Sequence, residues 1–377
     1  MRVKESQSKE FRAALLAWFA QSQRDLPWRR SRDPYRIWIS EIMLQQTRVA
    51  TVIPYYRKFL QRFPTVHQLA AAPEEEVLRM WSGLGYYRRA QNLQIAARQI
   101  VASYGGEFPR EKAEVLELAG IGEYTAAAVL SIAFGERLAA LDGNVARVLA
   151  RLDARRGDLR VAGRWRSLQD RADQLLDGEA AGDWNQALME LGATLCTPGP
   201  PQCLLCPVRQ FCEARKQGIA EQLPEKRRKR AEVAVRLAAA VLVDQSGNSL
   251  LLRPPATREP RPADDHVPAL VAKLWHFPTA LANGDGIRTL RQLFAKQLNM
   301  TRDKVVFEAL SAVRHTVTYR RIEVSPFLVR VSKLPPAGGS KTIALNAVLE
   351  QPISNLTRKV ARAALAVVAA DSIRSGG

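Results

Sequence analysis

The sequence is short of acidic residues, cysteines and long apolar runs, and each shortage excludes a class of protein. The 377 residues contain no apolar run as long as the roughly 18 residues that a membrane-spanning helix needs. The first residues, Met-Arg-Val-Lys-Glu-Ser-Gln, lack the apolar core of a secretory signal. We therefore expect a protein of the cytoplasm or nucleoid that is neither secreted nor bound in a membrane.

Acidic residues number only 37, against 56 Lys and Arg, which gives a formal net charge of +19 and an isoelectric point near 10.3. Such an excess of positive charge favours a polyanionic partner. Nucleic acid is the first candidate and a membrane surface the second, while a basic protein without any such partner is the alternative. Hydrophobic residues make up 47% of the chain, enough to fill the cores of the two domains that its length favours.

The four cysteines all lie within one short window, with the spacing Cys196-x6-Cys203-x2-Cys206-x5-Cys212. In a chain without an export signal, this confinement argues against structural disulfides and for one metal site. Thiolates suit both zinc and iron–sulfur clusters, so the residues alone leave the metal open.

A glycine-rich turn followed by an acidic residue forms a second motif. Gly120 and Gly122 stand between two predicted helices, residues 114–119 and 124–134, where glycine permits a tight hairpin with positive φ. They leave backbone N–H groups accessible at the start of the second helix, an arrangement that binds anions. Asp142 precedes the next predicted helix. It is either a chemical group beside a bound phosphate or only the N-cap of that helix.

Glu41 lies in the segment Ser-Glu-Ile-Met-Leu-Gln-Gln-Thr, with apolar residues on both sides. A buried carboxyl group without a partner keeps its proton to a higher pH, which is the property of a general acid near neutral pH. The alternative is a structural Glu that pairs with one of the many arginines.

Tyr86 and Tyr87, followed by two arginines, suit base stacking and phosphate contact, or else are core tyrosines.

The hydrophobic period changes along the chain. Helical periodicity persists to about residue 216, and a basic, exposed linker follows. Beyond it the pattern predicts strands and helices in the order strand 233–243, a return strand from 250, helix 287–298, two or three strands within 305–331 and helix 356–370. We therefore expect a helical domain over 1–216, a linker over 217–232 and an α+β domain over 233–377.

Taken together, these motifs make the sequence resemble the adenine DNA glycosylases of the MutY family over almost its whole length. Three parts carry the resemblance: Leu-Ala-Gly-Ile-Gly-Glu-Tyr with the later Leu-Asp-Gly-Asn-Val-Ala-Arg, the segment around Glu41, and the cysteine spacing. The resemblance implies a mainly α helix-hairpin-helix glycosylase domain with an iron–sulfur loop, followed by an α+β Nudix-like domain. It also implies that the four cysteines hold a [4Fe-4S] cluster.

The resemblance further implies a base-excision repair enzyme that extrudes and removes adenine mispaired with 8-oxoguanine or guanine in double-stranded DNA. Glu41 would protonate adenine at N7, and Asp142 would stabilise the oxocarbenium character of the sugar, as paired carboxyl groups do in glycoside hydrolysis. Tyr124 would belong to the same catalytic group. The other implied contacts are Arg29 and Gln186 to adenine, Gln46 and Tyr86 as residues that fill or wedge the duplex, and Gly120 and Gly122 to a phosphate.

Tyr124 also distinguishes this chain from endonuclease III, which shares the fold and cluster but has a Schiff-base lysine just after the hairpin glycines. We therefore expect a monofunctional glycosylase, acting as a monomer, that leaves the abasic site uncleaved. One alternative is a bifunctional oxidised-pyrimidine glycosylase and lyase that uses another lysine. The other is an architectural DNA-binding protein, which leaves the carboxyl groups and cysteines unexplained.

The C-terminal domain is similar to the Nudix-like domain that recognises 8-oxoguanine in this family. The predicted helix 287–298 contains no glutamate to hold Mg²⁺, so we expect no pyrophosphohydrolase activity. The family's recognition loop usually contains Phe-Ser-His or Phe-Thr-His, whereas this chain, aligned on His315, has Val317-Thr318-Tyr319. Only the hydroxyl residue Thr318 is retained. Tyr319 can donate a hydrogen bond or stack, but Val317 cannot stack as Phe does, so His315, Thr318 and Tyr319 are the candidate contacts to the opposing base.

Overall fold

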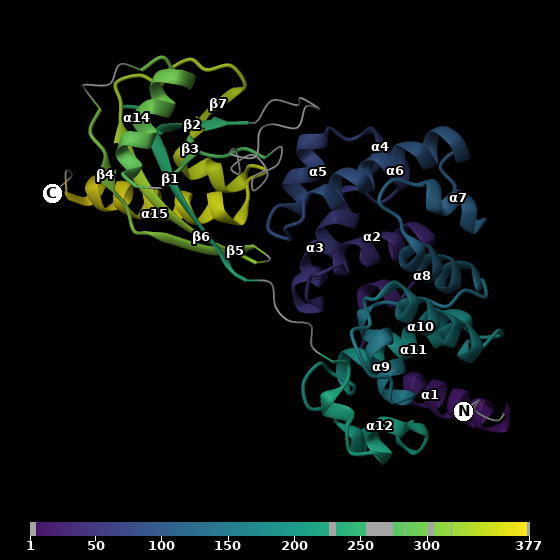
Figure 1. Ribbon diagram of the computed structural model, residues 1–377. Helices are drawn as coiled ribbons and strands as arrows, with labels where there is room; N and C mark the ends of the chain where they lie inside the picture. Colours follow the sequence, from purple (N-terminus) through teal and green to yellow (C-terminus); the bar gives the residue numbers. More distant parts are fainter. Residues whose placement is uncertain are drawn as a thin grey trace. The chain divides into compact units, whose positions relative to one another are not determined.

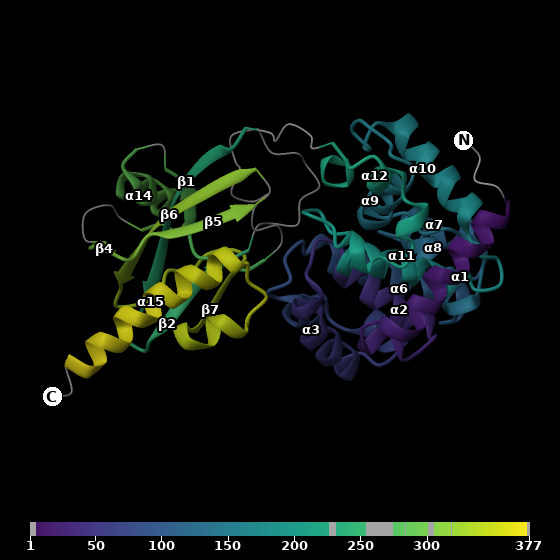
Figure 2. The same cartoon turned by 90° about the horizontal axis from the view of Figure 1, so that it is seen from below.

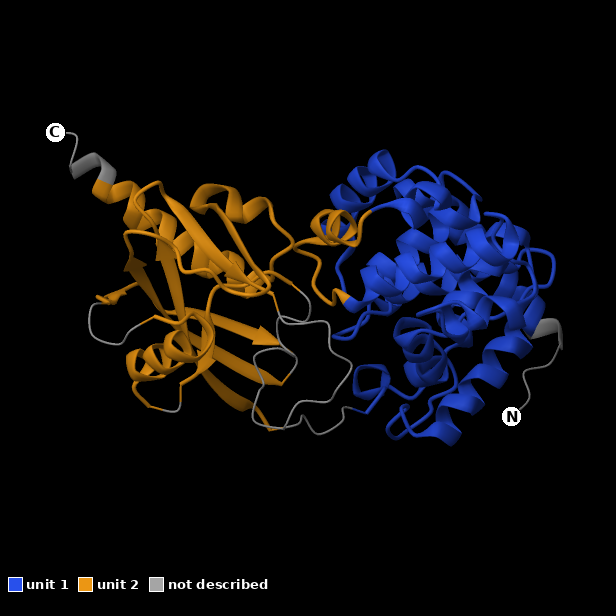
Figure 3. Cartoon of the chain, turned by 90° about the horizontal axis from the view of Figure 1, so that it is seen from above, with its two compact units in different colours: residues 1–72, 88–228 blue, residues 73–87, 229–377 orange. Residues whose placement is uncertain are grey.

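The computed structural model describes residues 5–225, 231–253, 274–282, 284–300, 305–317 and 319–374 (Figure 1). The chain divides into two compact units (Figure 3), residues 1–72 with 88–228 and residues 73–87 with 229–377. Among the helices of these described ranges, none combines the length and hydropathy needed to span a membrane.

The first unit is built of helices, as predicted. Its helices are α1 (Glu5–Ser22), α2 (Pro34–Leu44), α3 (Val49–Arg62), α4 (Val66–Ala71), α6 (Arg88–Tyr104), α7 (Lys112–Glu117), α8 (Glu123–Phe134), α9 (Gly143–Leu152), α10 (Ala162–Leu175), α11 (Ala181–Thr194) and α12 (Glu213–Lys216). Helix α8 lies at the centre, because its sequence is apolar on all sides and a helix of that kind is stable only when surrounded by protein. It packs against both α2 and α11, and so fixes the positions of these two helices.

The turn between α7 and α8 shows why one of its two glycines is needed. Gly120 has φ +79°, and a Cβ added there would lie 2.7 Å from the Cβ of Asn92. Gly122 is the N-cap of α8 with φ −111°, in open space. The prediction of a glycine hairpin before α8 is therefore right, but positive φ holds only at Gly120.

The second unit contains a seven-stranded mixed sheet with helices on both faces (Figures 1 and 2). The strands are β1 (Val233–Val243), β2 (Asn248–Leu252), β3 (Thr279–Leu281), β4 (Glu308–Ala309), β5 (Val313–Val317), β6 (Arg320–Arg330) and β7 (Ser340–Ala344). Their order is β4-β6-β1-β2-β7, with β3 paired to β1 and β5 paired to β6. Only β1 and β6 run parallel among these pairs.

Strand β1 is apolar and buried from Leu237 to Val243, where both of its faces are covered, while Val233, Ala234 and Arg236 before this stretch are exposed. Ala240 belongs to the same core cluster as Leu290 of α14 (Gly286–Gln297), while Val241 belongs to the cluster on the other face with Val360 of α15 (Asn355–Arg374). The mixed sheet between two helices confirms the α+β class. The sequence pattern missed β3 and β7, which are short strands of partly buried residues at which no alternation is visible.

Residues 73–87, which include α5 (Glu74–Trp81), group with the second unit and are hydrogen-bonded to it. The Tyr87 hydroxyl donates to the backbone carbonyl of Ile353 at 2.9 Å, and Arg358 donates to Ser82 Oγ at 2.8 Å. These contacts cross the boundary predicted at residues 217–232. Residues 226–230 of that predicted linker lie outside the described residues.

Replacing Gly120 with Ala is expected to destabilise the protein by about 2 kcal/mol, because the new Cβ is forced into a left-handed conformation and against Asn92. Gly122→Ala, in an extended conformation with free space, should cost about 0.5 kcal/mol. Denaturant unfolding of the two full-length variants measures the loss of unfolding free energy in each. Equal losses of stability would show that the backbone of Gly120 is not the constraint.

Candidate active site

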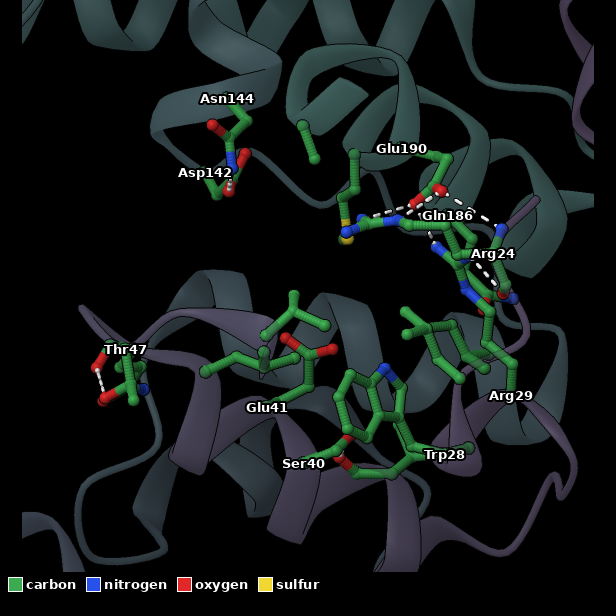
Figure 4. A pocket seen from close by; sticks show the side chains of 18 of the residues that line it. Arg24, Trp28, Arg29, Ser40, Glu41, Thr47, Asp142, Asn144, Gln186 and Glu190 are labelled. Atoms are coloured by element: carbon green, nitrogen blue, oxygen red, sulfur yellow. Dashed lines mark hydrogen bonds and ion pairs between the residues drawn. The ribbon is translucent and has the colours of Figure 1, made fainter. Parts of the chain in front are cut away.

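A cavity of about 730 Å³ in the helical unit collects side chains from α2, the 3-10 turn η1 (Pro27–Arg29), α8, α11 and the residues before α9 (Figure 4). It brings together six of the residues that the sequence singled out: Arg29, Glu41, Gln46, Tyr124, Asp142 and Gln186. These residues are up to 157 positions apart in the chain, so only the packing of α2 and α11 around α8 unites them.

Glu41 occupies the apolar floor of this cavity. Helix α2 begins after Asp33, whose carboxylate accepts the backbone N–H of Tyr35 at 2.8 Å, and it presents Glu41 to α8. Glu41 is 6% exposed, and its burial raises the pKa to about 7. Within the described part of the chain Glu41 forms no ion pair, so the alternative of a structural Glu–Arg pair is wrong.

Tyr124 supplies the polar contact to Glu41. Its hydroxyl donates to Glu41 Oε2 at 2.7 Å, which lowers the pKa of Glu41 but does not offset the effect of burial. Burial and the two neighbouring carboxyl groups hold the pKa of Tyr124 well above its ordinary value, so the hydroxyl remains a donor. One carboxyl oxygen of Glu41, Oε2, thus has a hydrogen-bond donor, and the residue lines the cavity.

Asp142 is both the N-cap of α9 and a group of the cavity, so the two interpretations of this residue are compatible. Its carboxylate accepts the backbone N–H of Val145 at 2.7 Å and the side-chain amide of Asn144 at 3.0 Å. Burial raises the pKa of Asp142, and these hydrogen bonds oppose the increase. Asp142 lies across the cavity from Glu41 (Figure 4). Burial favours the neutral form of both carboxyl groups, but the groups differ in their hydrogen bonds: Asp142 accepts two hydrogen bonds that favour its charged form, and Glu41 accepts one, from Tyr124.

Several residues of the cavity were not predicted, namely Arg24, Trp28, Asn144, Met189 and Glu190. Glu190 and Met189 lie on α11, and Glu190 follows Gln186 by four positions, so the two share one helix face. That spacing was the available signal for Glu190. Arg24 and Trp28 belong to the aromatic and basic turn before α2. The sequence of this turn does not indicate which of the arginines in the turn face the cavity.

Other predicted residues lie outside this cavity. Gly120 and Gly122 form the hairpin at the start of α8, two residues before Tyr124. Tyr86 belongs to the second unit, with φ +48° and 45% of its surface exposed.

The predicted recognition loop lies at the turn between β5 and β6. His315 on β5 pairs with Ile322 on β6, and burial with nearby Lys359 lowers the pKa of His315. The Tyr319 carbonyl accepts the N–H of Val233 at 2.9 Å, and the Arg320 guanidinium lies 4.9 Å from the centroid of the Tyr319 ring. Thr318 lies outside the described residues.

The four cysteines line one cavity beside Arg151. The Arg151 guanidinium is 3.3 Å from Cys196 Sγ, and burial together with the other three thiols raises the pKa of Cys206 to about 12. In the described residues no three His, Cys, Asp or Glu side chains are already arranged around a single point as a metal site. The thiols are nevertheless close enough to oppose one another's ionisation, which a bound cation would relieve. This donor set suits a thiolate-ligated metal or cluster.

Glu41→Gln is expected to stabilise the protein at alkaline pH. The folded protein keeps the Glu41 proton up to about pH 7, while the unfolded chain releases it near 4.5, the ordinary pKa of a Glu side chain. Stability is therefore lost as pH rises through this window, by on the order of 3 kcal/mol in total, and the Gln variant escapes that loss.

The measurement is the difference in unfolding free energy between variant and wild type, at about pH 4 and about pH 8. Glu10→Gln, which changes an exposed carboxyl group on α1, is the control. A difference that does not grow with pH would contradict the raised pKa of Glu41.

Comparison with known proteins gives one consistent result. A model of the HhH-GPD superfamily of base excision DNA repair proteins matches residues 39–172. Human adenine DNA glycosylase is 50% identical over 56% of this chain and 41% of its own length. The adenine DNA glycosylase of Buchnera aphidicola subsp. Baizongia pistaciae is 31% identical over 89% of this chain and 91% of its own. The structure of a thermostable thymine-DNA glycosylase is 32% identical and covers 56% of this chain and 98% of its own, with a TM-score of 0.52.

The chain spans less than half the length of its mammalian relatives, 41% of the human, 44% of the rat and 43% of the mouse protein. The Buchnera relative, in contrast, is matched over nearly all of its length, which includes most of both units described above. The chain therefore belongs to the adenine DNA glycosylase family of base-excision repair enzymes, within the helix-hairpin-helix superfamily.

Proposed function

We propose that this protein, acting as a monomer, removes adenine mispaired with 8-oxoguanine or guanine in double-stranded DNA and leaves an intact abasic site. The observation that carries the proposal is the pair Glu41 and Asp142 on one cavity: burial raises the pKa of Glu41 to about 7, and Asp142 accepts two hydrogen bonds that favour its charged form. The relatives named as adenine DNA glycosylases support adenine as the base.

The cavity suits an extruded nucleobase. Its volume of about 730 Å³ falls in the range of small-molecule sites, and a base must leave the stack to reach it. Arg29 and Gln186 line its wall and are the candidates to contact adenine. The net charge of +19 and the N–H groups of the Gly120–Gly122 hairpin provide attraction to the phosphates.

Glu41 and Asp142 then divide the chemistry. Glu41 transfers its proton to N7 of adenine, the bond from the sugar C1′ to N9 breaks, and the bonding electrons leave with a neutral base. The negative charge of Asp142 stabilises the oxocarbenium character that develops on the sugar. Water adds to C1′ and gives its proton to Glu41, which restores the acid. Tyr124 holds the Glu41 carboxyl group throughout by its hydrogen bond.

The absence of a nucleophilic amine supports a monofunctional enzyme. No lysine is among the residues that line the described cavity, and Tyr124 stands where a Schiff-base lysine would be needed. The sugar is therefore attacked by water, and strand cleavage has no covalent intermediate to proceed from.

We also propose that the four cysteines bind a [4Fe-4S] cluster. Supporting this assignment are their common cavity and the high pKa of Cys206, which metal binding would lower. Cys196, Cys203, Cys206 and Cys212 would be the ligands, and the cluster would hold the loop between α11 and α12 in one conformation. It supplies no step of the reaction above.

Single-turnover base release tests the function. The duplexes carry adenine opposite 8-oxoguanine, guanine or thymine, and an oxidised thymine opposite adenine. Strand scission of the adenine strand only after alkali, fastest opposite 8-oxoguanine, is expected. Glu41→Gln should retain binding to the mispair while its rate falls by about 100-fold or more. Scission of the oxidised-pyrimidine strand without alkali would instead assign the endonuclease III type of activity.

Recognition of the opposing base is tested separately. Replacing Thr318 and Tyr319 together with Ala should reduce the preference for 8-oxoguanine over guanine, because the loop then loses its hydroxyl groups and its aromatic ring. The rate on adenine opposite guanine serves as the internal control and should change little. An unchanged ratio of the two rates would remove the β5–β6 turn from the recognition site.

A further inference from the structure

Two guanidinium groups on the wall of the cavity share one buried carboxylate, that of Glu190. Its side chain has no exposed surface. Oε1 accepts the Nε of Arg24 at 2.7 Å and the backbone N–H of Arg24 at 3.2 Å, while Oε2 accepts Arg24 Nη2 at 2.8 Å and Arg29 Nη2 at 2.8 Å. All four of these hydrogen bonds converge on a single carboxylate, so both of its oxygens are fully used.

Arg29 is held from three directions. Besides Glu190, its Nη1 donates to the Arg24 carbonyl at 3.2 Å, and its guanidinium lies 5.2 Å from the centroid of the Phe19 ring. Its side chain is 11% exposed, against 38% for that of Arg24. A planar group fixed in this way meets a ligand without further loss of conformational freedom. The view into the cavity shows Arg24, Arg29 and Glu190 on the side of Gln186 (Figure 4).

The same group acts on Glu41 through charge. Four influences set the protonation of Glu41: burial and the charge of Asp142 favour the neutral form, while the Tyr124 hydroxyl and the charge of Arg29 favour the ionised form. Glu190 itself is ionised, because its arginine partners lower its pKa against the effect of burial. Its negative charge lies 2.8 Å from the Arg29 guanidinium and opposes that positive charge. Without Glu190, the charge of Arg29, the arginine that acts on Glu41, would be unopposed by this carboxylate.

We propose that Glu190 is a positioning residue for base excision: it orients Arg29 and Arg24 at the wall of the cavity and offsets their charge, so that Glu41 remains an acid. The inference rests on the proposed function of the cavity. It differs from a purely structural ion pair, which would contribute to stability and leave the pH dependence of the reaction unchanged.

The test compares Glu190→Gln, which keeps size and loses charge, with Glu190→Asp, which keeps charge. Asp153→Asn is the matched control, because Asp153 is likewise bonded to two arginines, Arg155 at 3.0 Å and Arg171 at 3.1 Å, but does not line the cavity. Single-turnover release of adenine opposite 8-oxoguanine is measured with saturating full-length enzyme from about pH 5.5 to about pH 9, per active site.

Glu190→Gln is expected to reduce the rate at neutral pH by about tenfold and to move the alkaline limb of the pH–rate profile to lower pH by about one unit. Glu190→Asp should recover part of the rate and part of the shift of the alkaline limb. Asp153→Asn should leave rate and profile unchanged, whatever it does to stability. A Glu190→Gln profile that coincides with wild type, or an equal change in Asp153→Asn, overturns the proposal.

Arg29→Gln provides a second variant that remains informative if Glu190→Gln does not fold. Removing the charge that favours ionised Glu41 should move the alkaline limb to higher pH, opposite to the effect of Glu190→Gln, while binding of the mispair weakens. A limb that stays in place or moves to lower pH overturns the proposal. A wild-type enzyme that releases no adenine would refute the proposed function itself, a result distinct from an active wild type whose Glu190 variants match it.

Discussion

The burial of one carboxyl group without an ion pair is the constraint on which the helical unit depends. Glu41 can keep a proton near pH 7 only if α2 places it against an apolar helix, and α8 provides that surface because nearly all of its residues are small or apolar. Burying Glu41 lowers the stability of the protein at alkaline pH. The buried residues of α2 and its N-cap Asp33 stabilise the helix that carries Glu41. Tyr124 limits this loss of stability with a single neutral hydrogen bond, whereas an arginine in its place would remove the acid.

Helix α9 connects this cavity to the cysteine loop. Asp142 caps its first turn, and Arg147 and Arg151 reach from its later turns to the segment that follows α11: Arg147 Nε donates to the Cys196 carbonyl at 2.9 Å and Arg151 Nη1 to the Thr197 carbonyl at 2.8 Å. Ten residues of α-helix span about 15 Å, so the carboxylate and the loop are joined by one short, rigid element. A metal-bound loop would therefore fix the end of α9 opposite to the one that carries Asp142.

Local sequence patterns predicted those features of the structure that depend on residues adjacent in the chain. Glu41 among apolar neighbours, Asp142 before a helix, and the apolar strand β1 all follow from adjacent residues, and each was found where the pattern placed it. The contact between Arg24 and Glu190 joins residues 166 positions apart. The spacing of Glu190 from Gln186 places both on one helix face, but no local pattern shows that two arginines would meet Glu190 there. The grouping of residues 73–87 with the second unit is also invisible in the sequence, because its hydrogen bonds are made to residues near 353 and 358.

The grouping of residues 73–87 with the second unit affects which unit carries each of the two proposed tasks, removal of adenine and recognition of the opposing base. Tyr86, proposed to wedge the duplex, has φ +48°, a conformation that is strained for a residue other than glycine and needs support from its surroundings. Gly83 and Gly85 beside it also have positive φ, which glycine adopts without strain. The support comes from the second unit, where Asn355 donates to the Gly83 carbonyl at 3.3 Å and the Tyr87 hydroxyl bonds to Ile353. The unit that carries the proposed recognition turn thus also holds the proposed wedge, while every group proposed to act on the adenine belongs to the helical unit. The residues that shift the pKa of Glu41, namely Arg29, Tyr124 and Asp142, all belong to the helical unit. Changes to the proposed recognition turn are therefore expected to leave this acid undisturbed.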